Sequence, residues 1–70
     1  MIYNRVGQKI KRARKRKHLS QSQVANLLHC SNVRISNMER GTVRITLSDL
    51  ERFAEIFGCD YMDFLEKSDT

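Results

Sequence analysis

Polar side chains fill most of the stretch 32–40, NVRISNMER, and their types suit contact with the edges of DNA bases. Only Ile35 and Met38 are apolar at positions that share a helix face, so the pattern predicts a short helix held by two residues, with its other face exposed. Amides pair with adenine and a valine meets the methyl group of thymine, which suits this face to a major groove. A solvated surface helix is the plainer alternative. The candidates for base contact are Asn32, Val33, Ser36 and Asn37.

Capping residues mark the start of this helix and of the helix before it. Ser20 precedes the run QSQVANLL, and Gln23 three residues later completes a capping box. Ser31 offers a second hydroxyl cap, and Gly41 is the residue best able to end the second helix in a left-handed conformation. The apolar side chains of the first helix share one face: Val24, Ala25 and Leu28. The stretch 21–40 is therefore predicted to form two short helices joined by a tight turn.

The positions of these residues resemble those of the phage-repressor-like (Xre-type) helix-turn-helix family. The matches keep one register over nearly the whole chain: Gly7, Ile10 and Arg14 upstream, Gln21, Ala25, Cys30, Ile35, Met38, Glu39 and Gly41 in the motif, and Phe53, Ala54, Phe57 and Gly58 downstream. The resemblance implies an all-α, compact five-helix, lambda-repressor-like DNA-binding domain spanning 1–70, with the motif at 21–40 and the recognition helix at about 32–40. One departure is His29, at the turn position where most members have glycine. A left-handed conformation there costs roughly 1 kcal/mol, which the turn can tolerate.

The resemblance also assigns contacts to individual side chains. In the family, the residue at Gln21 contacts phosphate, and Arg14 reaches Glu39 and ties the first helix to the recognition helix. Glu39 is the only acid among residues 1–44, where cations surround it, and this favours the pair over two independent surface charges. The candidates for phosphate contact are Gln21, Arg34, Arg40, Arg44, Lys9 and Arg16, with Arg44 also a candidate minor-groove reader.

Charge is unevenly distributed along the chain, whose formal net charge is +5. Residues 1–44 carry +10, because they hold eleven of the thirteen Lys and Arg and one acid, whereas residues 45–70 carry −5. The most basic run, KIKRARKRK at 9–17, is predicted to face phosphates, although a solvated helix face and an anionic membrane are alternatives. Its apolar stripe carries no Trp, Phe or Leu, which argues against the membrane.

The remaining elements follow from apolar spacing and caps. A first helix is predicted from about Gly7 to Lys17, after a short lead-in at 1–6. Thr46 and Asp60 are the predicted caps of two further helices. The expected buried positions are Leu47, Leu50, Phe53, Ala54 and Phe57 in the longer helix, and Phe64 and Leu65 in the shorter one.

Four apolar residues have no place on the predicted core faces, namely Ile45, Ile56, Tyr61 and Met62. Scattered surface hydrophobes are ordinary, so each can be an isolated exposed side chain. A cluster of them would instead mark a twofold contact between two copies of the chain. We take these four residues as the expected homodimer interface.

The function expected from these features is sequence-specific binding of double-stranded DNA. The chain would act as a homodimeric transcriptional regulator, a repressor or autoregulatory controller, on a palindromic operator. The alternative is a protein-interaction module on the same fold, such as an antitoxin or anti-repressor partner. No GxSxG, HExxH or glycine-rich phosphate loop occurs, so an enzyme is not expected.

Cysteine usage and hydropathy indicate the cellular compartment in which the protein is expected. Cys30 and Cys59 lack metal-ligand spacing and are expected to be reduced, buried thiols. No cofactor, metal ion or small-molecule ligand is indicated. Apolar runs extend over only a few residues, so no membrane span or signal peptide is expected, and the protein is expected in the cytoplasm.

Overall fold

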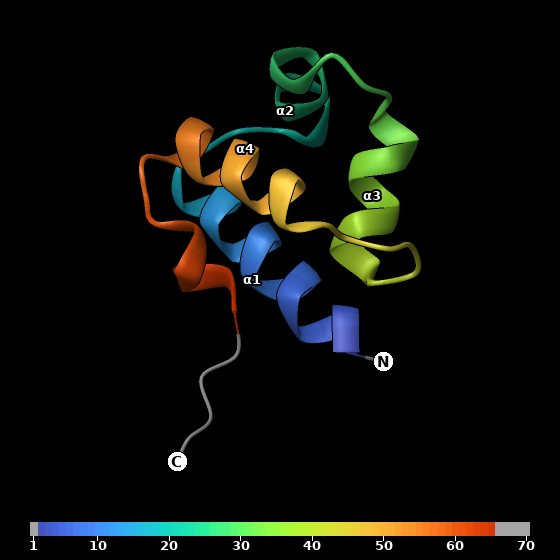
Figure 1. The fold of residues 1–70 in the computed structure, drawn as a ribbon. Helices are drawn as coiled ribbons and strands as arrows, with labels where there is room; N and C mark the ends of the chain where they lie inside the picture. The colour runs from blue at the N-terminus through green and yellow to red at the C-terminus, as the bar shows by residue number, and fades with distance from the viewer. Residues whose placement is uncertain (1, 66–70) are drawn as a thin grey trace.

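The structure, a computed structural model, describes residues 2–65, which form an all-α fold without strands in that range (Figure 1). Its elements are α1 (Ile2–Arg16), α2 (Gln21–Leu28), α3 (Asn32–Arg40), α4 (Leu47–Phe57) and a 3₁₀ helix, η1 (Tyr61–Phe64). The expected fold class is correct, but the expected number of five α-helices is wrong, because the described residues form four. The last element has only four residues, a length at which the tighter 3₁₀ winding is common.

α1 is longer than the sequence pattern suggested. It begins at Ile2 rather than near Gly7, so most of the predicted lead-in is helical. Tyr3 and Val6 pack against the core and extend the apolar face toward the N-terminus, which gives the first turns a reason to be helical. The helix ends at Arg16 instead of Lys17, because His18 adopts a left-handed conformation with φ 59°.

The predicted helix caps are confirmed. Ser20 accepts a hydrogen bond from the Gln23 backbone N–H, and the Gln23 side chain accepts one from the Ser20 N–H, which completes the capping box. Ser31 caps α3, and Asp60 caps η1. Thr46 caps α4 and forms a second capping box with Asp49. His29 adopts the left-handed turn conformation expected of it, with φ 59°.

The core lies between α1, α2, α3 and α4 and is closed by η1. Its largest fully buried side chains are Phe53, Phe57, Phe64, Ile10, Ile35, Met38 and Val24. Two predictions fail at its edges: Leu47 is 53% exposed and Leu65 is 40% exposed, because each lies at the end of its element, beyond the packed layer. Cys30 and Cys59, predicted to be buried, are half-buried.

α1 and α3 approach each other so closely that a side chain would not fit at Gly7. A Cβ atom there would lie 2.4 Å from the Met38 carbonyl oxygen and 2.5 Å from the Glu39 carbonyl oxygen. Only glycine permits this backbone contact. The two helices therefore form one closely joined pair, in which a face of α1 directed away from α3 points to the opposite side of the molecule.

Candidate nucleic-acid interface

The outer side of α3 presents the side chains predicted to contact bases. Ile35 and Met38 of α3 are buried beneath it, so the opposite side of the helix faces solvent. Val33 is 66% exposed, and Asn37 lies one helical turn further along the same side. Asn32 is exposed in the first turn, and Ser36 is half-buried. Asn32, Val33, Ser36 and Asn37 together are called the outer face of α3 below.

Hydrogen bonds orient both asparagines of the outer face. Asn32 Nδ2 donates to Ser22 Oγ on α2 over 3.1 Å, and Arg40 Nη2 donates to Asn37 Oδ1. Asn32 keeps its carbonyl oxygen and one N–H for a base, and Asn37 keeps its amide nitrogen. Nothing in the sequence spacing pointed to Ser22, because a turn separates it from Asn32.

A shallow hollow of about 350 Å³ lies beside the outer face, where α2 meets the start of α3. Its lining residues are Ser22, Ala25, Asn26, Cys30 and Asn32. The lining carries amide and hydroxyl groups without a charged side chain. This surface can exchange hydrogen bonds with a ligand, whereas it offers no charge to hold an ion.

A buried ion pair supports α3 from behind. Glu39 Oε2 lies 2.6 Å from Arg14 Nε, and Glu39 Oε1 accepts from Arg14 Nη2 over 3.1 Å, which is the pair that the family resemblance implied. Arg14 also donates to the Leu19 carbonyl oxygen over 2.8 Å, and Gln21 Nε2 donates to Glu39 Oε1 over 3.0 Å. This network joins α1, the start of α2 and α3. Because the pair is fully hydrogen-bonded, its burial fixes how the three helices meet.

Four of the residues predicted to contact phosphate lie on or beside α3. Gln21 uses one of its amide hydrogens on Glu39, so one hydrogen stays available at the start of α2. Arg34 is exposed and has its Nη2 3.7 Å from Asp49 Oδ1. Arg40, at the end of α3, and Arg44, in the following loop, are also exposed. These four cationic or amide side chains flank the outer face.

Comparison with known proteins assigns the family. A family model described as a helix-turn-helix domain matches residues 5–63, most of the chain. The chain belongs to the helix-turn-helix domain family. The resemblance inferred from its sequence is thus confirmed. A comparison with curated protein sequences gives no match.

Several solved structures share the fold of this helix-turn-helix domain. The restriction-modification controller protein C.AhdI from Aeromonas hydrophila matches with a TM-score of 0.83 and 22% identity, over 90% of this chain and 96% of that one. The clp gene regulator ClgR from C. glutamicum matches with a TM-score of 0.85 and 19% identity, over 91% and 83%. The DNA-binding domain of BldD matches with a TM-score of 0.82 and 22% identity, over 93% and 94%. At these identities the likeness shows the fold.

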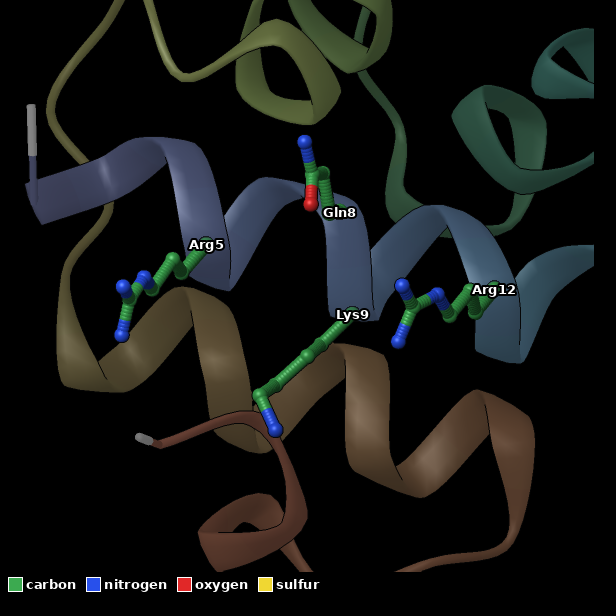
Figure 2. Close-up of a pocket in the computed structure, with 4 residues that line it drawn as sticks. All are labelled: Arg5, Gln8, Lys9 and Arg12. Carbon is green, nitrogen blue, oxygen red and sulfur yellow. The ribbon is translucent and has the colours of Figure 1, made fainter. Parts of the chain in front are cut away.

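Lys9 and Arg16, also predicted to contact phosphate, are not placed with the other candidates. Lys9 follows Gly7 by two residues, and Arg16 follows Arg14 by two, and both of those earlier residues face α3. Two residues correspond to about 200° around a helix axis. Lys9 and Arg16 therefore lie on the side of α1 directed away from Gly7 and Arg14, apart from the candidates on and beside α3. Figure 2 shows Lys9 with Arg5 and Arg12 extending from this side of α1.

The predicted homodimer residues divide into two groups. Ile45 is buried in the core, so its assignment to a surface contact is wrong. The loop after α3 directs it inward, where the sequence offered no periodic pattern to show it. Ile56 and Tyr61 are half-buried against the core, and Met62 is 51% exposed. Of the four, only Met62 is exposed as the prediction required.

Burial and neighbouring carboxylates act on the Cys59 thiol. Partial burial raises the pKa of the Cys59 thiol, and the carboxylates of Asp63 and Asp60 raise it further. This thiol therefore stays protonated at neutral pH and is a poor nucleophile. Among residues 2–65, no group of three or more His, Cys, Asp and Glu side chains is placed to hold a metal ion. The helices of the same range include none long and apolar enough to span a bilayer.

Proposed function

We propose that this helix-turn-helix domain binds double-stranded DNA sequence-specifically and regulates transcription, as a repressor or autoregulatory controller. The observation that carries the proposal is the outer face of α3, a set of exposed and half-buried amide, hydroxyl and apolar side chains backed by a buried ion pair. A helix fits the major groove, and such side chains distinguish bases there. Two proteins with this fold are the clp gene regulator ClgR and the DNA-binding domain of BldD, which supports the same function here.

Recognition of bases falls to the outer face in this proposal. Asn32, held by Ser22, presents its carbonyl oxygen to an amino group of adenine or cytosine. Val33 meets a thymine methyl group, and Ser36 serves as donor or acceptor. Asn37 donates from Nδ2 to a base acceptor while Arg40 holds its oxygen. Each good base contact discriminates by about 1 to 3 kcal/mol, so a few suffice to select a site.

Phosphate contacts fix the helix in the groove. Gln21 offers its second amide hydrogen at the N-terminus of α2, where the helix dipole also favours an anion. Arg34, Arg40 and Arg44 supply positive charge along α3 and the loop behind it. These contacts carry no base preference, and each neutralised phosphate adds to the salt dependence of binding.

We further propose that residues 1–70 act as one domain and that two copies bind a palindromic operator. Met62, with Ile56 and Tyr61 at its margin, is the apolar surface that supports a twofold contact. A twofold dimer presents two copies of α3 to successive major grooves. The operator would then contain half-sites whose centres are about 10 base pairs apart.

The test is a binding-site selection from random duplex DNA with the wild type, Asn37→Ala and Arg40→Ala. We expect the wild type to select a palindrome. Asn37→Ala should relax the preference at one or two symmetric base pairs, whereas Arg40→Ala should keep the preference and weaken binding to all sequences. Asn4→Ala, at an exposed asparagine on α1, is the matched control and should select the wild-type sequence.

Three outcomes contradict different parts of the proposal. If Asn37→Ala selects the wild-type sequence with uniformly lower affinity, the wrong side of α3 has been assigned to the groove. If the wild type retains no duplex even at low salt, the domain does not bind DNA, and the protein-interaction alternative gains support. A selected site without twofold symmetry would remove the dimer alone.

A further inference from the structure

A second row of cations follows the side of α1 that points away from α3. Its members are Arg5, Lys9, Arg12 and Arg16, at helical spacings i, i+4, i+7 and i+11. Residues at these spacings lie along one side of a helix. We call this row the far strip. At a rise of about 1.5 Å per residue, it extends over roughly 16 Å.

The position of the far strip is fixed by how α1 packs. The face of α1 that meets α3 contains Gly7, whose backbone contacts the carbonyls of α3, and Arg14, which is paired with Glu39. Lys9 and Arg16 each follow one of these residues by two positions, which turns them to the other side of the helix. The far strip and the outer face of α3 therefore point to opposite sides of the joined helix pair.

Positive charge on the far strip is not neutralised by its own helix. α1 contains seven Lys and Arg and no acid. The buried Arg14 is matched by Glu39, whereas Lys9, Arg12 and Arg16 have no ion pair within residues 2–65. A net charge of this kind attracts a polyanion and releases its counterions on contact.

The far strip also has a shape that can receive an anionic group. A polar hollow of about 280 Å³ is lined by Arg5, Gln8, Lys9 and Arg12 (Figure 2). Arginine side chains offer planar, paired donors that match phosphate oxygens, and lysine adds a point charge. Amide groups for reading bases are scarce here, since Gln8 is the only one in the hollow. The chemistry fits a sugar-phosphate backbone rather than a base edge.

The acidic part of the molecule limits the strip at one end. Asp60, before η1, and Asp63, in η1, act on the same Cys59 thiol as Arg16 and Lys17. Negative charge at this end of the strip opposes the approach of a phosphate. We therefore expect a polyanion to contact chiefly Lys9, Arg12 and the hollow that they help to line.

We propose that the far strip binds the backbone of a second nucleic-acid duplex, so that one copy of the domain can hold two duplex segments at once. The first segment is the one on α3, and the bridging therefore rests on the proposed function. One short duplex cannot supply both contacts, because DNA has a persistence length of about 150 base pairs and does not fold around a small domain. Contact with the second segment is independent of sequence and sensitive to salt.

An anionic membrane is the competing partner for a basic helix, and the strip lacks what membrane binding requires. Helices that lie on membranes insert a broad apolar face into the lipid. From Tyr3 to Arg16, the apolar residues of α1 instead pack against the protein core, where Ile10 is fully buried and Tyr3, Val6 and Ala13 are partly buried. The exposed side chains of the same range are cationic or amide groups, which favours a nucleic-acid backbone.

The test measures whether the protein joins two duplexes. A duplex carrying the selected site is fixed to beads, protein is added, and capture of a fluorescent duplex without the site is measured at low salt. We expect the wild type to capture it and Lys9→Gln/Arg12→Gln to reduce capture at least tenfold, with binding to the fixed duplex retained. Lys11→Gln/Lys15→Gln removes the same charge from the same helix outside the strip and should capture at least half as much as the wild type. Circular dichroism verifies that all variants are folded.

Two further arms separate this inference from the proposed function. An Asn37→Ala/Arg40→Ala variant, impaired on α3, should still bind a single random duplex, and adding Lys9→Gln/Arg12→Gln should lower that remaining affinity at least tenfold. This comparison holds even if no sequence is ever selected. Repeating it with duplex RNA shows whether the strip prefers one kind of backbone, and either preference supports the inference.

The inference is overturned if the wild type binds the fixed duplex but captures no second one, or if the strip variant and the Lys11→Gln/Lys15→Gln control behave alike. Equal capture by these two variants would indicate that a dimer bridges the duplexes through its two copies of α3, because both variants keep α3 intact. Vesicles containing anionic and neutral phospholipid provide the last arm. Lys9-dependent and Arg12-dependent binding to vesicles without duplex capture would assign the strip to a membrane and also overturn the inference.

Discussion

The outer face of α3 and the far strip of α1 are both exposed polar surfaces, yet they differ in how their side chains are held. Both asparagines of the outer face are hydrogen-bonded, Asn32 to Ser22 and Asn37 to Arg40. On the far strip, Lys9, Arg12 and Arg16 have no ion pair within residues 2–65. Lys9 is half-buried, and Arg12 and Arg16 are exposed. Oriented amides can distinguish one base from another, whereas cations without a fixed partner follow the charge of a backbone. The comparison suggests that one small helix pair can present specific and non-specific chemistry on opposite sides.

The same contacts position both surfaces. Gly7 allows α1 and α3 to touch through their backbones, and the Arg14–Glu39 pair joins them near the other end of α1. Because the helices form one unit, a change at their contact should affect both surfaces together. A change on either exposed side should affect that side alone. The three predictions below test this distinction, from the largest expected effect to the smallest.

The largest effect is expected from Glu39→Gln. Glu39 is 5% exposed, and its replacement leaves the buried Arg14 guanidinium without its countercharge. Breaking one partner of a buried pair costs about 3 to 5 kcal/mol of unfolding free energy. Chemical denaturation would measure this loss, and DNA binding by α3 and by the far strip should weaken at the same denaturant concentration.

Glu51→Gln and Glu55→Gln are the matched controls, because both residues are exposed on α4. Each should change the unfolding free energy by no more than about 0.5 kcal/mol, the usual range for surface substitutions. If Glu39→Gln behaves like these controls, the pair does not hold the helices together. Loss of α3 binding without loss of strip binding would show that the two surfaces are not positioned in common.

A smaller effect is expected on the salt dependence of binding, which should distinguish the outer face of α3 from the far strip. Removing one phosphate contact reduces the slope of log K against log salt by about 0.9. Arg40→Ala should therefore flatten the slope for the selected duplex, while Lys9→Gln should leave it unchanged and flatten the slope for the second duplex. Fluorescence anisotropy at several salt concentrations measures both. Equal changes in both slopes for either variant would mean that one surface serves both duplexes.

The local features of the fold were predictable from the sequence because their causes are local. Ser20 and Thr46 begin helices through hydrogen bonds to residues three positions later, and a three-residue spacing is visible in the sequence. The predicted burial of Leu47 was wrong, because helical spacing shows which side of a helix is apolar and cannot show where the core ends. Ile45 was misplaced for the reverse reason, because a loop has no period from which burial can be inferred.

The candidate site was less predictable, since it depends on how helices distant in sequence meet. The candidates for base contact on α3 could be named from one helix alone, and in the structure Asn32 and Val33 are exposed while Ser36 and Asn37 are half-buried. In the sequence, Lys9 could not be distinguished from the other cations of the first helix. The contact of Gly7 with α3 shows which side of α1 meets α3, and therefore on which side Lys9 lies. The partner of Asn32 was also invisible, because Ser22 reaches it across a turn. Residue types indicated the chemistry, whereas packing decided which groups can act together.

The smallest effect is expected from Ser22→Ala, which tests whether the orientation of Asn32 matters. The change removes the acceptor of the Asn32 Nδ2 hydrogen bond, which is exposed and worth about 0.5 to 1.5 kcal/mol at most. Stability should barely change, and discrimination at the base pair facing Asn32 should relax by less than tenfold, because the amide can then rotate. The measurement compares affinities for the selected site and for sites with single base changes. Ser48→Ala, at an exposed position near the start of α4, is the matched control and should leave every ratio unchanged. If Ser22→Ala gives the same ratios as that control, the order seen on the outer face does not contribute to reading sequence, and the contrast with the far strip reduces to side-chain type alone.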